Sequence, residues 1–382
     1  MSAIANSLPR SGLIHISLNL LMVQPANKVN TEAQENLREV SYEHSNNLAE
    51  ILTHLQISLF FSTYQAGKLG VVTVKENTLK IAFHNFERAM GMAVNKSRMA
   101  VGGKDWVYFL KNDTDIAAQI EPAGSHDACF LTKSGQYTGD ISIHDLAWGG
   151  QELWIVNTRF SCLCTLSNNY NFIPQWQPNF VTAIAPEDRC HLNGMAMVNG
   201  MPKYVTVLGQ TDTPGGWRSQ KAHAGCVLEV PSSKVITEGL SMPHSPRMYQ
   251  GVLWVLNSGK GELITVDPKS GNQETIVVLP GYTRGMAIVG KYAFIGLSKI
   301  RETAIFGNLP ISDRFDELKC GIAVVDLQAK QMISCLEFKS GIDEIFDLQT
   351  AAFSSTMISG PYAVTDGVNQ IWSLPASAAK KY

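Results

Sequence analysis

The sequence predicts an all-β protein, a six-bladed β-propeller with a short helical N-terminal extension. The main observation is a repeat, in which a knot of polar or charged residues is followed at once by a short apolar strand. Six repeats of about fifty residues are typical of propeller blades. Strand and turn signals also alternate as in antiparallel meanders, and the absence of a crossover-helix pattern excludes a doubly wound parallel sheet. The residues that open the six apolar strands, called opening residues below, are Gly91, Asp145, Gly194, Ser245, Gly285 and Asp347.

Composition narrows the class of protein. The chain has 382 residues, of which 45% are hydrophobic and 31 are glycines, so we expect a large core interrupted by many turns. A formal net charge of -2 argues against a general nucleic-acid surface. Seven cysteines have neither disulfide-like nor zinc-like spacing and predict reduced thiols in a cytoplasmic protein. No apolar run reaches the roughly 18 residues of a membrane span, so neither nucleic acid nor membrane is expected as a partner.

The N-terminal part has a helical pattern. We divide the chain into an N-terminal arm and helix, residues 1–56, and a propeller, residues 57–382. The helix is expected from Asn30 to about Gln56, where Asn30 or Thr31 can cap it and acidic residues follow in the first turn. One apolar face favours one or two helices packed on the rim of the propeller. The residues of that face are Leu37, Val40, Leu48, Ile51, Leu52 and Leu55.

The two ends of the β region predict how the ring closes. The last knot, Glu344–Gln349, leads into an innermost strand with only an irregular continuation. The first β region, Leu59–Phe86, contains three strands but has no knot before it. Joined, they form one blade from both ends of the chain, which hides sheet edges that would otherwise be exposed. The tail Ile358–Leu374 must then pack as an extra strand or hairpin, and seven blades remain the alternative.

Function is expected at the mouth of the central channel. In an antiparallel four-stranded blade, the start of the innermost strand and the end of the second strand lie at the same end. The knots precede the innermost strands, and two long inserts, Gln210–Arg218 and Ile300–Lys319, follow the ends of second strands. Knots and inserts therefore converge on one face of the propeller.

Three histidines open consecutive repeats at matching positions. Neutral imidazoles around an axis can serve as general acids and bases, or they can hold one divalent metal ion with help from neighbouring oxygen ligands. The alternative is that each histidine is only a structural turn residue. The candidate metal ligands are His144, His191 and His244, and the candidate catalytic residues are these three together with Asp145 and Glu344.

Arginines recur around the same mouth. A guanidinium matches a carboxylate, phosphate or sulfate, so these residues predict a small anionic molecule or a modified peptide as the ligand. The alternative is that they form salt bridges with acidic residues of the rim. Trp217 lies on a glycine-flanked insert and could act as a lid. The candidate substrate-binding residues are Tyr64, Arg88, Arg159, Asn193, Trp217, Arg218, Arg247, Arg284 and Arg301.

Five long motifs stand out in the β region: Ser62–Leu69, Val156–Leu163, Glu187–Gly194, Met242–Arg247 and Gly296–Glu302. They resemble the motifs of a family of bacterial conserved hypothetical proteins, known as a domain of unknown function. The resemblance covers roughly Leu48 to Leu374 and implies no particular activity. A looser resemblance, in architecture and axial histidines, is to six-bladed propellers of the gluconolactonase and strictosidine-synthase type and to the propeller lyase that cleaves peptidyl-hydroxyglycine. Members of those groups hold a divalent metal ion in the axial channel, so the resemblance implies one here.

Two hypotheses about function follow. The first is an enzyme with a His- and Arg-lined pocket at the channel mouth, performing hydrolase, lyase or isomerase chemistry with or without a metal ion. The second is a non-catalytic propeller module that binds a protein or peptide. An enzyme buries its polar residues in a concave pocket, whereas a scaffold spreads apolar anchors over an open face. The many charged and imidazole side chains at the mouth favour the enzyme.

Overall fold

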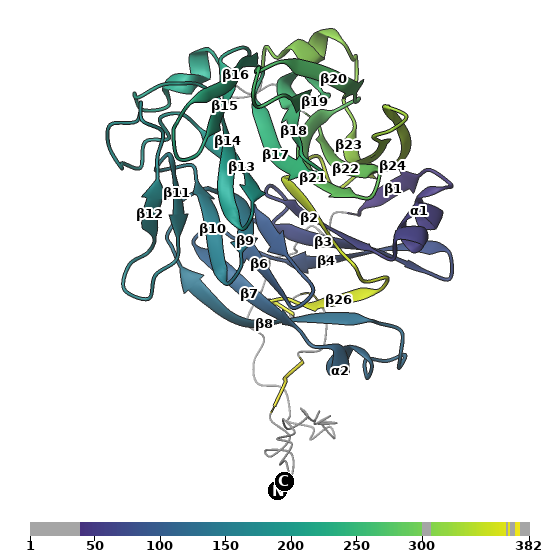
Figure 1. Cartoon of the computed structure of the whole chain (residues 1–382). Coiled ribbons are helices and arrows are strands. Elements are labelled where there is room, and N and C mark those ends of the chain that lie inside the picture. The colour runs from purple at the N-terminus through teal and green to yellow at the C-terminus, as the bar shows by residue number, and fades with distance from the viewer. Residues whose placement is uncertain (1–38, 300–306, 364–365, 367–370, 375–382) are drawn as a thin grey trace, which may run out of the picture.

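Six sheets surround one axis. The computed structural model describes residues 39–299, 307–363, 366 and 371–374. Within them the strands form six sheets around the axis (Figure 1), and neighbouring strands pair antiparallel except at the outer edge of blade 2. The innermost strands contact one another in a closed ring, which confirms the six-bladed propeller. In ring order the innermost strands of blades 1 to 6 are β25 (Asp347–Ala351), β5 (Met92–Val94), β9 (Ile143–Gly149), β13 (Leu192–Val198), β17 (Pro243–Tyr249) and β21 (Tyr282–Val289).

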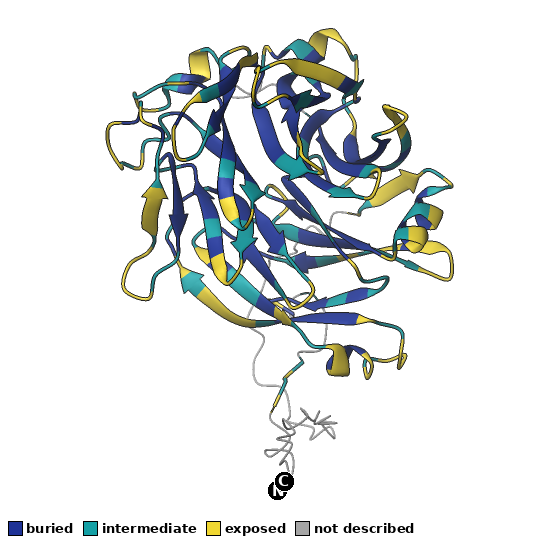
Figure 2. Cartoon of the chain, viewed as in Figure 1, coloured by how far each residue is buried: buried dark blue, intermediate teal, exposed yellow. Residues whose placement is uncertain are grey.

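The other strands continue each blade outward. Buried residues gather in the inner strands, and exposure rises toward outer strands such as β12, as Figure 2 shows. Blades 1 to 3 are completed by β2 (Ser58–Thr63), β3 (Lys68–Lys75), β4 (Thr78–Asn85), β6 (Arg98–Gly102), β7 (Trp106–Asn112), β8 (Ala128–Tyr137), β10 (Glu152–Asn157), β11 (Cys162–Thr165) and β12 (Ile173–Trp176). Blades 4 to 6 are completed by β14 (Met201–Val207), β15 (Gly225–Glu229), β16 (Val235–Leu240), β18 (Val252–Asn257), β19 (Glu262–Val266), β20 (Gln273–Val278), β22 (Tyr292–Ser298), β23 (Cys320–Asp326) and β24 (Gln331–Ser340). The short helical elements are α1 (Leu48–Leu55), α2 (Thr114–Ala117) and the 3-10 turns η1 (Gly216–Ser219), η2 (Ser258–Lys260) and η3 (Pro310–Asp313).

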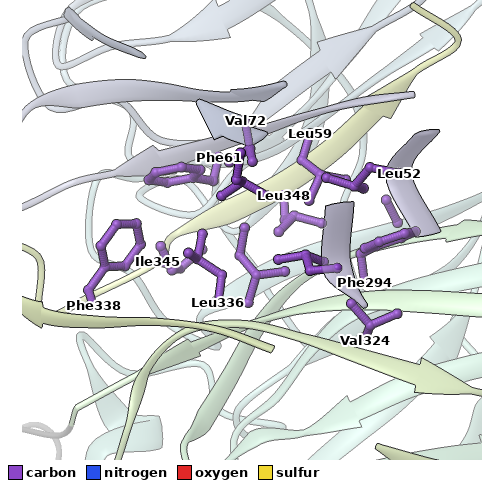
Figure 3. Close-up of a cluster of buried hydrophobic side chains, with 14 of the residues drawn as sticks. Leu52, Leu59, Phe61, Val72, Phe294, Val324, Leu336, Phe338, Ile345 and Leu348 are labelled. Carbon is purple, nitrogen blue, oxygen red and sulfur yellow. The ribbon is translucent and has the colours of Figure 1, made fainter. Parts of the chain in front are cut away.

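Blade 1 joins the two ends of the chain, as the sequence predicted. The late strand β25 pairs antiparallel with the early strand β2, so that Phe61 lies opposite Leu348. A buried cluster fills the seam between blades 1 and 6 and includes Phe61, Leu348, Phe294 and Phe338 (Figure 3). Leu52 of α1 packs into the same cluster. The ring is therefore closed by strand pairing and by a continuous apolar core.

Glycine opening residues permit the close approach of neighbouring blades. A Cβ atom on Gly91 would lie 2.9 Å from backbone atoms of Asp145, the opening residue of the next blade. A Cβ atom on Gly285 would lie 2.5 Å from the Leu348 nitrogen of blade 1, and the φ angle of Gly285 is 75°. Side chains at these positions would collide with the neighbouring backbone and, at Gly285, would also strain their own.

Polar opening residues alternate with the glycines and fasten each blade to the next. Each accepts a hydrogen bond from a backbone N–H group on the following blade, which satisfies a buried donor. The repeated knots therefore encode, in part, how the ring is held together. The three bonds run from Met195 N to Asp145 Oδ2 (3.1 Å), from Gly285 N to Ser245 Oγ (3.0 Å) and from Met92 N to Asp347 Oδ2 (2.8 Å).

The N-terminal prediction was only partly right. The described part of the expected helix contains α1, but Ser41–His44 forms a strand, β1, which pairs with β24 on the outer edge of blade 6. The physical reason is tertiary, because β1 covers an edge whose N–H and C=O groups would otherwise lack partners. Residues 30–38 of that prediction lie outside the described residues. Of the tail Ile358–Leu374, the first two residues belong to a strand, β26 (Thr356–Ser359), which pairs parallel with β8. Residues 364–365 and 367–370 of that tail lie outside the described residues.

Two further observations concern membrane-spanning helices and the state of the cysteines. No helix in the described ranges is long and apolar enough to cross a membrane. All seven cysteines are free thiols, and six of them are buried.

Candidate functional site

A cavity of about 480 Å³ lies at the mouth of the channel, called the mouth cavity below. Its wall is formed by the knots before the innermost strands and by the insert after β14, as the sequence predicted. This volume suits a small molecule, since ligand pockets are usually some 300–1,000 Å³. Eight residues singled out from the sequence line it: Tyr64, His144, His191, Trp217, Arg218, His244, Arg284 and Glu344.

Hydrogen bonds fix the tautomers of His144 and His244. Nδ1 of His144 lies 3.1 Å from the Ser142 carbonyl oxygen and 2.8 Å from Oγ1 of Thr158. Nδ1 of His244 lies 2.8 Å from the Met242 carbonyl oxygen. A carbonyl can only accept, so both Nδ1 atoms carry the proton and donate. The Nε2 atoms are left with their lone pairs available.

His191 is oriented by a carboxylate. Its Nδ1 lies 2.9 Å from Oδ2 of Asp188, three residues earlier, and the φ angles of both residues are positive. This local turn brings the two side chains together. Nδ1 therefore donates to the carboxylate, and Nε2 is the free nitrogen of a ring that lines the cavity. An imidazole held in this way is a typical general base.

Burial keeps two of the imidazoles neutral. It lowers the pKa of His144 well below the usual histidine value, and the neighbouring His191 and Arg284 lower it further. Burial also lowers the pKa of His244 strongly, with a smaller contribution from Arg284. At neutral pH both rings therefore stay uncharged, and their Nε2 atoms can accept a hydrogen bond.

Trp217 covers His191. The indole and imidazole ring centroids are 4.3 Å apart, and the indole Nε1 donates to Oδ2 of Asp188 at 3.1 Å. The insert that carries Trp217 is held by Asp212, which accepts a hydrogen bond from the Thr182 nitrogen at 2.9 Å and pairs with Arg189 at 2.7 Å. Trp217 is thus both a buried residue and the cover of the cavity.

Arg284 is a cation in the cavity wall, and the charge of Glu344 acts on it. Its guanidinium lies over the Phe346 ring, 3.4 Å from the ring centroid. No described residue accepts a hydrogen bond from it, and its Nη2 atom is buried. Burial lowers the pKa of Arg284. A partly buried guanidinium in this condition favours an anionic ligand, because unmet charged donors are costly.

Two predicted site residues lie elsewhere on the axis. Asp145 and Arg247 do not line the mouth cavity but pair with each other, with 2.9 Å between Oδ2 and Nη1. Arg247 also donates to the carbonyl oxygens of Met195 and Met286 and lies 3.9 Å from Asp347. These contacts make the pair a link between blades rather than part of the pocket wall.

Other predicted residues are also absent from the lining of the mouth cavity. Arg88 and Arg159 both pair with Asp140, at 3.3 and 2.9 Å, which is the salt-bridge alternative of the sequence analysis. Asn193 accepts a hydrogen bond from Thr206 at 2.6 Å within blade 4. Arg301 lies outside the described residues.

The three histidines do not fit a three-ligand metal site. Their free Nε2 atoms are of the type that binds metals, and Nδ1 donors of this kind often support metal ligands. However, the described residues contain no group of three His, Cys, Asp or Glu side chains placed to hold one ion. The oxygens of Asp145 and Asn193, close to His144 and His191 in the sequence, are taken up by other bonds. The divalent ion remains a prediction that elemental analysis of the purified protein would test.

Sequence reasoning missed several residues of the site. Asp188 is not among the candidate residues of the sequence analysis, although its position three residues before His191 was a usable signal. Phe346 lies inside the last knot, and Tyr282 and Lys299 flank strands of blade 6. Aromatic residues of this kind carry no local sign that they face a cavity rather than the core.

The fold and the mouth cavity define a six-bladed β-propeller with an enclosed axial pocket. The family model described as "Domain of unknown function (DUF4915)" matches residues 46–357, and the chain belongs to this family. This confirms the resemblance found in the sequence motifs.

Solved structures give more distant likenesses. A chain of a nidogen/laminin complex has 9% identity and a TM-score of 0.46, covering 78% of this chain and 99% of that chain. Virginiamycin B lyase from Staphylococcus aureus has 8% identity and a TM-score of 0.39, covering 74% of this chain and 76% of that chain. A comparison with curated proteins gave no match.

Proposed function

We propose that the protein is an acid–base enzyme that binds a small anionic molecule in the mouth cavity. The observation that carries the proposal is the Asp188–His191 pair in a cavity with Arg284, whose buried Nη2 atom has no hydrogen-bond partner among the described residues. Arg284 would hold the anion, and Nε2 of His191 would take or return a proton. His144, whose ring centroid is 4.8 Å from that of His191, would accept a hydrogen bond from the substrate.

Lyase or isomerase chemistry is the reaction class best supported. Within the described residues, no serine hydroxyl or cysteine thiol is bonded to a free Nε2 atom, so an activated nucleophile is not apparent. Cys190 precedes His191 in the sequence, but burial raises the pKa of its thiol to about 12. Proton transfer at a carbon near the anionic group needs only the residues present. The second candidate reaction is hydrolysis, in which His191 activates a water molecule.

The proposal can be tested without knowing the substrate. The parent protein is incubated with a panel of small carboxylic acids in D₂O, and mass spectrometry measures deuterium gained at carbon. We expect exchange with at least one compound and a loss of about 10²-fold or more in His191→Gln. The exposed His54 provides the matched control His54→Gln, which should exchange like the parent. Exchange unchanged in His191→Gln, or absent for every compound, would contradict the proposal and favour the non-catalytic binding module.

We also infer a cytoplasmic location. The support is that none of the seven cysteines forms a disulfide. Alkylation of the protein isolated from its own cells under non-reducing conditions would test this, and a disulfide found there would contradict it.

A further inference from the structure

A continuous wall of rings lines the mouth cavity. The Tyr64 and Phe346 rings stack with 5.9 Å between centroids, and Phe346 contacts the His144 ring at 5.2 Å. His144 contacts His191 at 4.8 Å, and His191 contacts Trp217 at 4.3 Å. Flat rings in series offer a ligand apolar faces against which a ring or a short chain can lie.

Two methionines complete the apolar lining. Met90 and Met242 face the same cavity and are buried. Thioether side chains are flexible and polarisable, so they adapt to apolar ligands of different outline. A purely inorganic anion would leave most of this lining without a partner.

The charged side chains of the lining favour a ligand with one negative charge. Three cationic side chains, Arg218, Arg284 and Lys299, face two carboxylates, Asp188 and Glu344. Arg218 lies 3.7 Å from Asp188, which offsets that pair. Burial keeps the His144 and His244 imidazoles uncharged, so the charged side chains among the described lining residues leave about one excess positive charge. A carboxylate would balance it, whereas a phosphate monoester brings about −1.5 to −2.

We infer that the ligand of the mouth cavity is a monocarboxylate with an apolar, ring-sized body. This inference rests on the proposed function and names the class of its substrate. The carboxylate binds Arg284, and the body lies along the wall from Phe346 to Trp217. The proton-accepting Nε2 of His191 then faces the body of the ligand rather than its charge.

Calorimetric titration tests this class. The parent protein is titrated at constant pH and ionic strength with acetate, phenylacetate and phenyl phosphate. We expect phenylacetate to bind at least tenfold more tightly than acetate, because only its ring buries apolar surface, and at least tenfold more tightly than phenyl phosphate. Arg284→Met should weaken phenylacetate binding by at least tenfold. Arg98→Met is the matched control, because Arg98 lies over Trp148 outside the mouth cavity, and its affinity should equal that of the parent.

The outcomes separate this inference from the proposed function. Equal affinities for acetate and phenylacetate would overturn the apolar body, and tighter binding of phenyl phosphate would overturn the carboxylate. Either result leaves an anion-binding enzyme standing. If Arg284→Met binds phenylacetate as the parent does, the assigned position of the carboxylate is wrong. If the parent binds none of the three at tens of millimolar, both the inference and the anionic substrate of the proposed function fail.

Discussion

Two arginines on the innermost strands of neighbouring blades behave in opposite ways. Arg247 on β17 donates to Asp145 and to backbone carbonyl oxygens of Met195, Pro246 and Met286. Arg284 on β21 donates to no described residue and lies in the wall of the mouth cavity. The guanidinium of Arg247 is bonded within the fold, whereas that of Arg284 is available to a ligand.

The register of the strand explains this difference. Arg247 comes two residues after the opening residue Ser245, inside the ring, where it meets the side chains that fasten the blades. Arg284 comes one residue before the opening residue Gly285, at the mouth. An arginine near the axis is therefore not by itself a sign of ligand binding. Its position relative to the opening residue, and the hydrogen bonds it already makes, decide its role.

The largest expected effect is on stability. Arg247→Met leaves Asp145 and Asp347 buried without their cation, which should lower the free energy of unfolding by about 3–5 kcal/mol. Arg284→Met removes a partly buried cation that has no hydrogen bond, so it should change stability by less than about 1 kcal/mol. Guanidinium chloride denaturation of both variants measures the contrast. Equal losses in the two would remove the distinction between the arginines.

The next effect depends on pH. Burial, and then the charge of Asp145, raise the pKa of Asp347 from 3.8 to about 7. The folded protein then binds this proton more tightly than the unfolded chain does, so stability falls as pH rises from about 4 to 7, by up to roughly 4 kcal/mol. Asp347→Asn should remove this loss, so its stability relative to the parent should rise across that window.

Buried histidines also make stability depend on pH. The quantity to measure is therefore the difference in unfolding free energy between the parent protein and Asp347→Asn. Burial lowers the pKa of His84 to about 4 and the pKa values of His144 and His244 strongly. These groups destabilise the fold as pH falls below about 6.5, which opposes Asp347. The parent and Asp347→Asn share the contribution of the histidines, so it cancels from the difference in their unfolding free energies. A pH-independent difference between parent and Asp347→Asn would show that Asp347 titrates normally.

A ligand effect of intermediate size should depend on Arg284. A monocarboxylate present at a hundred times its dissociation constant should stabilise the parent by about 2.7 kcal/mol through mass action. Thermal unfolding should show this shift in the parent and in Arg98→Met, and it should be absent in Arg284→Met. A shift retained in Arg284→Met would place the anion elsewhere.

The smallest effect concerns the cover of the cavity. Hydrogen bonds from Thr182 and the pairing with Arg189 lower the pKa of Asp212 to about 2, so the carboxylate is charged at all ordinary pH values. Asp212→Asn should weaken the hold on the Trp217 insert and raise amide exchange there several-fold, with the blades unchanged. Mass spectrometry of exchange resolves the two regions. Uniform protection in the variant would mean that these contacts do not hold the insert.

The fold was largely predictable because its signals are local. Each blade has its own knot, apolar strand and turns, and the unmatched ends of the β region implied their pairing. The strand β1 was not predictable from local pattern, since Ser41 pairs with Ser340 at the far end of the chain. Leu48 and Leu52, further along the chain, do lie on a helix, so the apolar pattern was correct for that segment.

The site was predictable in place but not in detail. The knots put the histidines at the mouth because they precede the innermost strands. The sequence did not separate Asp145, which accepts from the Met195 nitrogen, from residues that face the cavity. That choice depends on the direction of each side chain at the seam between blades, which is set by the register of the neighbouring blade. The position of Asp188 three residues before His191 was a local signal, but the contact between its carboxylate and the imidazole is a feature of the folded turn.

The central claim is that the mouth cavity binds a carboxylate at Arg284. A crystal structure of the protein with phenylacetate tests it most directly. The account predicts the ligand inside the mouth cavity, with a carboxylate oxygen about 2.7–2.9 Å from a nitrogen of the Arg284 guanidinium. Its ring should lie along the wall between Phe346 and Trp217. Phenylacetate bound at another site, or bound in the cavity with Arg284 still lacking a hydrogen-bond partner, would contradict the account.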